Sequence, residues 1–65
     1  MEYTNSQARE AIAEHIHSLR DRRILEKRLI DGLTYERIAE DMEMSVRQIK
    51  NIIYKNEEIL FSKMH

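Results

Sequence analysis

The chain has 65 residues, a formal net charge of −1 at pH 7, no cysteine, no proline and one glycine. A chain of this length makes one small, marginally stable domain, and without cysteine it has neither a disulfide nor a thiolate metal site. No apolar run approaches the roughly 20 residues that span a bilayer, and the N-terminus lacks the basic flank and apolar core of a signal peptide. We therefore expect a single cytoplasmic domain, residues 1–65, without membrane association.

The first predicted helix begins after Thr4, because Thr4 and Gln7 have the spacing of a capping box. Apolar residues then recur at helical spacing. Ser18, three residues before Asp21, is a second N-cap candidate and predicts a break or bend at that point. Since no proline or glycine interrupts this segment, a single helix running through to Ile30 is the alternative.

The second predicted helix runs from Leu19 or Arg20 to Ile30, with its apolar residues inward and its cations outward. It ends at Gly32, the only residue of the chain that adopts a left-handed C-cap without steric cost.

Two short helices joined by a tight turn are predicted next. Thr34 is a good N-cap for a helix over about residues 35–41, and Ser45 is one for the helix that follows. Gln48 completes a capping box with Ser45. Ala39 is small enough to let the two helices approach closely where they cross.

The last helix carries Ile49, Ile52 and Ile53 on one face and can continue past Lys55. Polar residues at 56–58 interrupt this apolar stripe. We therefore expect the end of the chain to fray or to form a short separate helix.

The predicted core draws on every helix: Ile12, Ile16, Leu19, Ile24, Leu25, Leu29, Ile30, Leu33, Ile38, Met42, Met44, Ile49, Ile52 and Ile53. Some apolar residues lie outside the two-helix motif and exceed its needs: Ile12, Ile16, Ile59, Leu60, Phe61 and Met64. At roughly 25 cal/mol per Å², leaving them exposed would forfeit several kcal/mol. We expect the N-terminal helix and C-terminal tail to pack together, within one chain or across a homodimer; the alternative is that they simply cover the motif in a monomer.

Charge is zoned along the chain. Residues 20–28 carry five cations and two acids, and residues 46–55 carry three cations and no acid, so each segment has a local charge of +3. Residues 36–45 carry four acids and one cation, a local charge of −3. The net charge argues against indiscriminate coating of nucleic acid, whereas the zoning places a positive segment on the last helix. Chance clustering in a highly charged chain is the alternative.

Several runs together resemble the helix-turn-helix of bacterial regulators and, more closely, the promoter-reading region 4 of sigma factors. They are Arg23-Ile24-Leu25, Arg28-Leu29, the run from Asp31 to Ala39, and the run from Met44 to Ile52, within roughly the last two thirds of the chain. The resemblance implies an all-α fold, a small four-helix domain with a helix-turn-helix at about residues 34–55. The family's turn often carries glycine where this chain has Glu43, and a left-handed conformation there costs on the order of 1 kcal/mol.

In a helix-turn-helix the second helix lies in the major groove, and its N-terminal residues contact base edges. If the isoleucines face the core, Arg47, Lys50 and Asn51 face outward. Arg47 and Lys50 can then donate to guanine O6 and N7, and Asn51 can pair with adenine. The alternative is that these residues form a solvated polar face.

The remaining contacts are predicted around this helix. Val46 can contact a thymine methyl, whereas Tyr54, Lys55 and Arg37 are better placed for phosphates. Thr34 and the free backbone N–H groups at the start of its helix can also hold a phosphate. The full set of predicted DNA-binding residues is Thr34, Tyr35, Arg37, Ser45, Val46, Arg47, Lys50, Asn51, Tyr54 and Lys55.

Other cations and the histidines are weaker candidates. Arg22, Arg23 and Arg28 can steer a duplex or face a protein, although a solvated polar surface is the better interpretation for Arg20 and Arg22. The histidines at 15 and 17 point about 200° apart on a helix and do not share a metal. The sequence contains no nucleophile–base pair with a supporting third group and no glycine-rich phosphate loop, and no spacing suggests a buried carboxylate pair. We expect no enzyme, no cofactor and no metal.

Two functions stay open. The first is a sequence-specific, double-stranded DNA-binding transcriptional regulator of a bacterium, phage or mobile element, which as a homodimer would match a palindromic site. The second is a protein-interaction module on the same fold, docking on RNA polymerase or inhibiting a host protein. In that case the acidic third helix and the apolar tail carry the contact.

Overall fold

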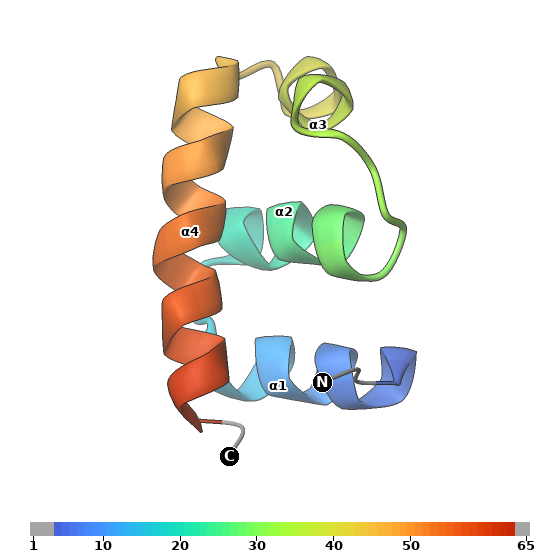
Figure 1. Cartoon of the computed structure of the whole chain (residues 1–65), viewed down its shortest axis with the longest axis vertical. Coiled ribbons are helices and arrows are strands. Elements are labelled where there is room, and N and C mark those ends of the chain that lie inside the picture. The colour runs from blue at the N-terminus through green and yellow to red at the C-terminus, as the bar shows by residue number, and fades with distance from the viewer. Residues whose placement is uncertain (1–3, 64–65) are drawn as a thin grey trace.

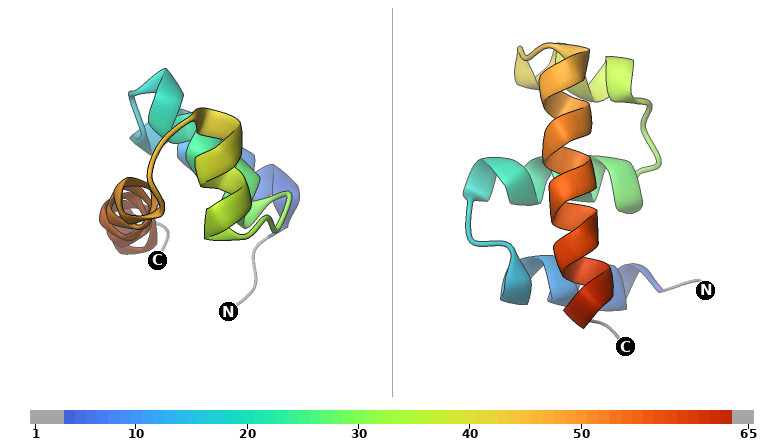
Figure 2. Two further views of the ribbon diagram at one scale, coloured as in Figure 1. Left: turned by 90° about the horizontal axis from the view of Figure 1, so that it is seen from above. Right: turned by 60° about the vertical axis from the view of Figure 1, so that its left-hand side comes forward.

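The computed structural model describes residues 4–63, with side chains up to residue 62. Over this range the chain forms four helices and no strand: α1 (Asn5–His15), α2 (Leu19–Leu29), α3 (Tyr35–Met42) and α4 (Val46–Lys63). The first three lie one above another along α4, which contacts each of them (Figures 1 and 2). The expected all-α, four-helix architecture is confirmed.

The helix starts follow the predicted caps. Thr4 and Gln7 exchange side-chain and backbone hydrogen bonds at 2.9 and 3.2 Å. The Ser18 hydroxyl accepts from the backbone N–H of Asp21. Because Ser18 itself is extended, with φ −79° and ψ 125°, α1 and α2 are separate helices, and the alternative of one continuous helix is wrong.

Arg22 joins these two helices. Its guanidinium donates to the Ala13 carbonyl at 2.7 Å and to the Ile16 carbonyl, at the open C-terminal end of α1. The C-terminal end of a helix leaves carbonyls without intrahelical partners, and a cation there also interacts favourably with the negative end of the helix dipole. The expectation that Arg22 belongs to a solvated polar face is therefore wrong.

One core holds residues from all four helices. Its buried members are Ala11, Ile12, Ile16, Ile24, Leu25, Ile38, Ala39, Ile49, Ile53 and Leu60. Since α1 and the end of α4 contribute to the same core as the helix-turn-helix, they pack together within one chain. Leu19, which we expected in the core, is 70% exposed at the first position of α2. Met64 lies outside the described residues.

The end of α4 differs from both expectations, because the helix continues unbroken to Lys63. Asn56 lies on its core face and is only 4% exposed. Its Nδ2 donates to the Ile52 carbonyl at 2.8 Å and to Asp21 Oδ2 at 3.3 Å. A buried amide whose donors are used costs little, so the buried face runs through Asn56 to Leu60. The predicted fraying or separate helix is wrong.

None of the helices in residues 4–63 combines the length and apolar character needed to cross a bilayer.

Candidate nucleic-acid interface

The turn between α3 and α4 sets the position of α4. Glu43 ends α3 in the left-handed conformation, with φ 56° and ψ 45°. The Met44 N–H donates to the Ala39 carbonyl at 2.9 Å, and Ser45 and Gln48 complete a capping box at 3.0 and 3.1 Å. Ala39 is buried between the helices, as its small side chain predicted. The turn therefore lies where the sequence placed it, including the strained residue.

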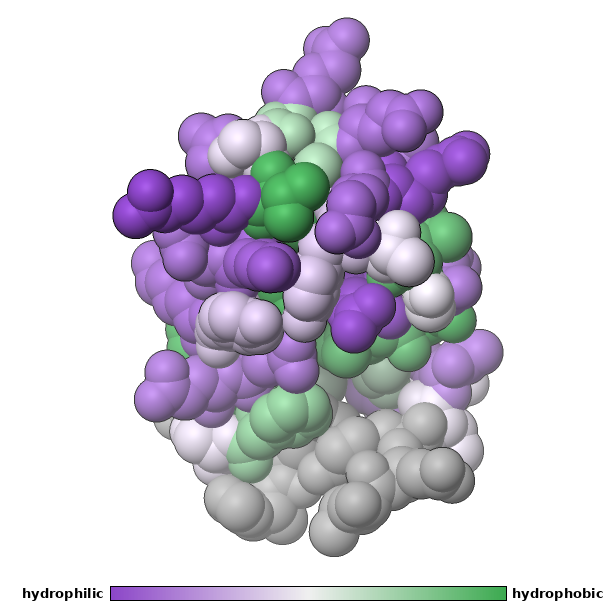
Figure 3. Space-filling model, turned by 45° about the horizontal axis from the view of Figure 1, so that its top comes forward, coloured by the Kyte–Doolittle hydropathy of each residue, from purple (hydrophilic) through white to green (hydrophobic). Residues whose placement is uncertain are grey.

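The two sides of α4 differ sharply in exposure. Ile49 and Ile53 are fully buried, whereas Arg47, Asn51 and Lys55 are exposed. The segment 46–56 contains no acidic residue. The end of the molecule formed by α3 and the start of α4 carries mostly hydrophilic side chains around a small hydrophobic spot (Figure 3). Arg47, Lys50 and Asn51 therefore form an exposed, acid-free ridge opposite the buried isoleucines.

Several predicted contact residues have other partners or lie less far outward. Val46 is half-buried and packs against the core, so its side chain is only partly exposed for the expected thymine contact. The Thr34 hydroxyl accepts from the Arg37 N–H, and the Ser45 hydroxyl from the Gln48 N–H. Arg37 Nε pairs with Asp41 Oδ1 at 3.2 Å, while 63% of the Arg37 side chain stays exposed.

Lys50 of this ridge meets three residues beside it, and we call the four together the tyrosine cluster: Arg28, Tyr35, Lys50 and Tyr54. Arg28 Cζ lies 4.4 Å from the centre of the Tyr35 ring, and Lys50 Nζ lies 5.7 Å from it. The Tyr54 ring meets Tyr35 edge-on, at 6.2 Å between centroids and 89° between planes.

Contacts of the tyrosine cluster fix the orientation of the Arg28 guanidinium and raise the pKa of Tyr35. Hydrogen bonding with the Tyr54 side chain is the main reason that the pKa of Tyr35 is raised. Arg28 Nη1 also donates to the Leu33 carbonyl at 2.9 Å, which fixes its guanidinium beside the ring. The sequence predicts Tyr35 and Tyr54 at a DNA interface but not Arg28 as their partner, because no helical spacing relates residues on either side of a loop.

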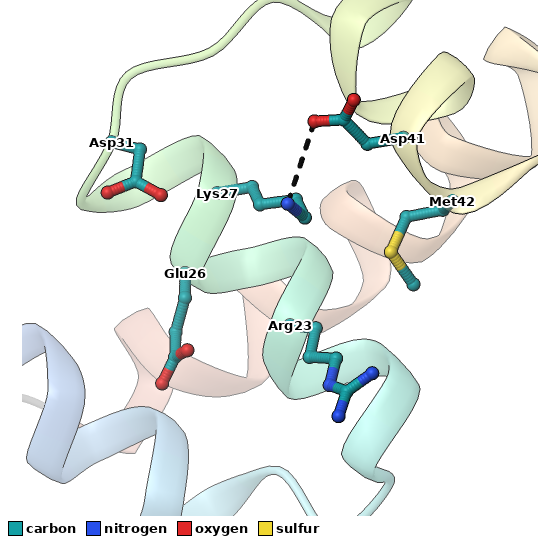
Figure 4. A pocket seen from close by; sticks show the side chains of 6 residues that line it. All are labelled: Arg23, Glu26, Lys27, Asp31, Asp41 and Met42. Carbon is teal, nitrogen blue, oxygen red and sulfur yellow. Dashed lines mark ion pairs between the residues drawn. The ribbon is translucent and has the colours of Figure 1, made fainter.

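A hollow of about 380 Å³ lies between α2 and α3. It is lined by Arg23, Glu26, Lys27, Asp31, Asp41 and Met42 (Figure 4). Lys27 Nζ points toward Asp41 Oδ2, 3.6 Å away, so charges of both signs already face one another across it. Such a lining favours neither an anion nor a cation, and the hollow is not part of the candidate interface.

A family model described as Sigma-70, region 4 matches residues 18–55, more than half of the chain. The chain belongs to the sigma-70 region 4 family. The family is a non-enzymatic DNA-binding domain, so this sigma-70 region 4 domain is a helix-turn-helix protein and not an enzyme. The match takes in α2, α3 and the first part of α4, and leaves α1 and residues 56–63 outside it. No curated protein and no solved structure matches the chain.

Proposed function

We propose that this sigma-70 region 4 domain is a sequence-specific transcriptional regulator that places the N-terminal half of α4 in the major groove of duplex DNA. The observation that carries the proposal is the exposed, acid-free ridge of Arg47, Lys50 and Asn51, opposite the fully buried Ile49 and Ile53. A helix held this way presents guanidinium and amide groups, which are the groups that recognise guanine and adenine edges. The family's non-enzymatic character agrees with a role in binding alone.

The surroundings of the ridge support docking through α4. Lys55 and Tyr54 extend the exposed face and suit phosphate contacts. By contrast, α3 carries the exposed acids Glu36 and Glu40, which repel phosphates over most of that helix. Because Glu36 lies in the first turn of α3, the N-cap residue Thr34 is the part of α3 left for a backbone contact.

Selection of duplexes from a random pool, followed by fluorescence anisotropy, tests this function. We expect a defined sequence to be enriched, and Arg47→Ala and Asn51→Ala each to weaken its binding about 5- to 150-fold, as expected for loss of a bidentate base contact. Arg9→Ala is the matched control, because Arg9 is an exposed cation on α1, far from the start of α4 (Figure 1). Enrichment of no sequence, or equal losses in the control, would refute the proposal.

A protein-interaction role on RNA polymerase or a host protein is the second candidate. The net charge of −1, the acidic face of α3 and a 44% exposed Phe61 near the end of α4 favour it. Retention on heparin or random duplex at low salt separates the two functions. Equal and negligible retention of the wild type and an Arg47→Ala/Lys50→Ala variant would favour a protein partner, whereas a loss in the variant alone favours DNA.

The homodimer stays a prediction without support, because apolar residues that suggested it lie in the core of a single chain: Ile12, Ile16 and Leu60. We propose a monomer as the binding unit. Sedimentation equilibrium at micromolar concentration should give the mass of one chain, 7.9 kDa, and a mass of twice that value would restore the dimer. Phage or mobile-element origin and a cytoplasmic location likewise stay predictions.

A further inference from the structure

The direction of Lys50 distinguishes it from its neighbours on α4. Its Nζ lies 5.7 Å from the centre of the Tyr35 ring, at the first position of α3. A cation within about 6 Å of an aromatic face is attracted by the negative charge of that face. The ammonium group of Lys50 is therefore drawn sideways, toward the neighbouring helix.

The ring that attracts Lys50 is itself held in place. Arg28 lies over it at 4.4 Å and is fixed by a 2.9 Å hydrogen bond to the Leu33 carbonyl. Tyr54 packs against it edge-on at 6.2 Å. These two contacts, one from α2 and one from α4, restrict the movement of the Tyr35 ring, so the ring fixes the direction of the lysine.

Arg47 and Asn51 have no such partner. Among residues 4–62 neither makes a side-chain hydrogen bond, an ion pair or a ring contact, and both are exposed one helical turn apart. Their polar groups are free to extend straight away from the core face of α4. Reading a base edge requires this freedom, because the side chain must reach the floor of the groove.

We propose that Lys50 contacts a backbone phosphate at the edge of the groove, that Arg47 and Asn51 read the bases, and that Tyr35 is the positioning residue that sets this division. This inference rests on the proposed DNA-binding function. In a helix-turn-helix the first helix crosses the DNA backbone, so a lysine directed toward the start of α3 is directed toward phosphates. A compact ammonium charge also suits a phosphate better than the two-point geometry of guanine. The proposal replaces our sequence-based expectation that Lys50 donates to guanine.

The first experiment compares Lys50→Ala with Arg47→Ala in the full chain. Lys50→Ala should select the same DNA sequence as the wild type, lose affinity by a similar factor on selected and unrelated duplexes, and lower the slope of log K against log salt by about 0.9. Arg47→Ala should instead change the base preferred at one position. A changed base preference in Lys50→Ala, or an unchanged salt slope, would overturn the proposal.

The second experiment tests Tyr35 as the positioning residue. Tyr35→Leu removes the ring, and Tyr35→Phe retains it. We expect the affinity loss caused by Lys50→Ala to be about two- to fivefold smaller in the Tyr35→Leu background, and unchanged in the Tyr35→Phe background. Equal losses in both backgrounds would refute the positioning role.

A measurement without DNA separates this inference from the proposed function. The ring should shift the Lys50 ε-methylene proton resonances upfield in the free wild type and in Tyr35→Phe, but not in Tyr35→Leu. Absence of that shift in the wild type refutes the positioning role even if DNA binds. Failure of the wild type to select any duplex refutes DNA reading by this ridge, and with it the division of contacts.

Discussion

Replacing Glu43 with glycine should stabilise the domain. Glu43 has φ 56° and ψ 45°, a conformation that costs a residue with a Cβ roughly 1–2 kcal/mol. Glycine removes that cost but makes the unfolded chain more flexible, which offsets about 0.4–1 kcal/mol. Loss of a negative charge at the C-terminal end of α3 adds a few tenths of a kcal/mol. The net expectation is about 1 kcal/mol of added stability.

Thermal unfolding followed by circular dichroism measures this change. For a domain of this size, about 1 kcal/mol corresponds to a rise in Tm of about 4–8 °C. Glu43→Ala is the matched control, because it removes the charge while keeping the Cβ, and it should gain only the electrostatic part. If Glu43→Ala raises Tm as much as Glu43→Gly, then backbone strain is not the cause and the reasoning is refuted.

Three further substitutions test the backbone conformation at Gly32, the buried amide of Asn56 and the hydrogen bonding of Tyr54. Gly32→Ala, at φ 69° with open space around the added Cβ, should cost on the order of 1 kcal/mol in urea unfolding; no loss would contradict backbone strain. Asn56→Asp brings a buried carboxylate beside Asp21. Burial and the like charge of Asp21 raise the folded-state pKa of the new carboxylate. The substitution should cost about 3 kcal/mol at pH 7 and less below about pH 4, and a pH-independent loss would contradict this. Tyr54→Phe should lower the pKa of Tyr35 toward its ordinary value, as measured by NMR titration.

Local signals predicted the helix boundaries well. The capping boxes of Thr4 and Ser45 act within three residues, so the sequence contains both partners of each bond. The left-handed positions at Gly32 and Glu43 are likewise local properties of helix ends. These features placed the turn of the helix-turn-helix and the exposed face of α4.

Contacts between distant segments were harder to predict. Asn56 looked like a break in the apolar face of α4, because its partner Asp21 lies 35 residues away. Leu19 fitted the apolar pattern but is exposed, since the first residue of α2 extends beyond the core. Arg22 was expected on a solvated surface, and Arg28 was expected to steer a duplex or face a protein, but the fold brings a backbone carbonyl to each of them. In each case helical spacing gives the face of one helix but not what lies opposite.

The hydrogen bond between Asn56 and Asp21 has a consequence for how precisely α4 is held. A surface of isoleucines alone would allow the helix to slide by one turn against α2 with little penalty, because one branched aliphatic group replaces another. Sliding would keep the bond to the Ile52 carbonyl on the same helix but would break the bond to Asp21 and leave that N–H donor among hydrocarbon, so a single axial register is favoured. Arg47 and Asn51 lie on the same helix, three turns or less from Asn56. The hydrogen bond from Asn56 to Asp21 therefore also fixes the position of these two side chains along the α4 axis relative to the rest of the domain.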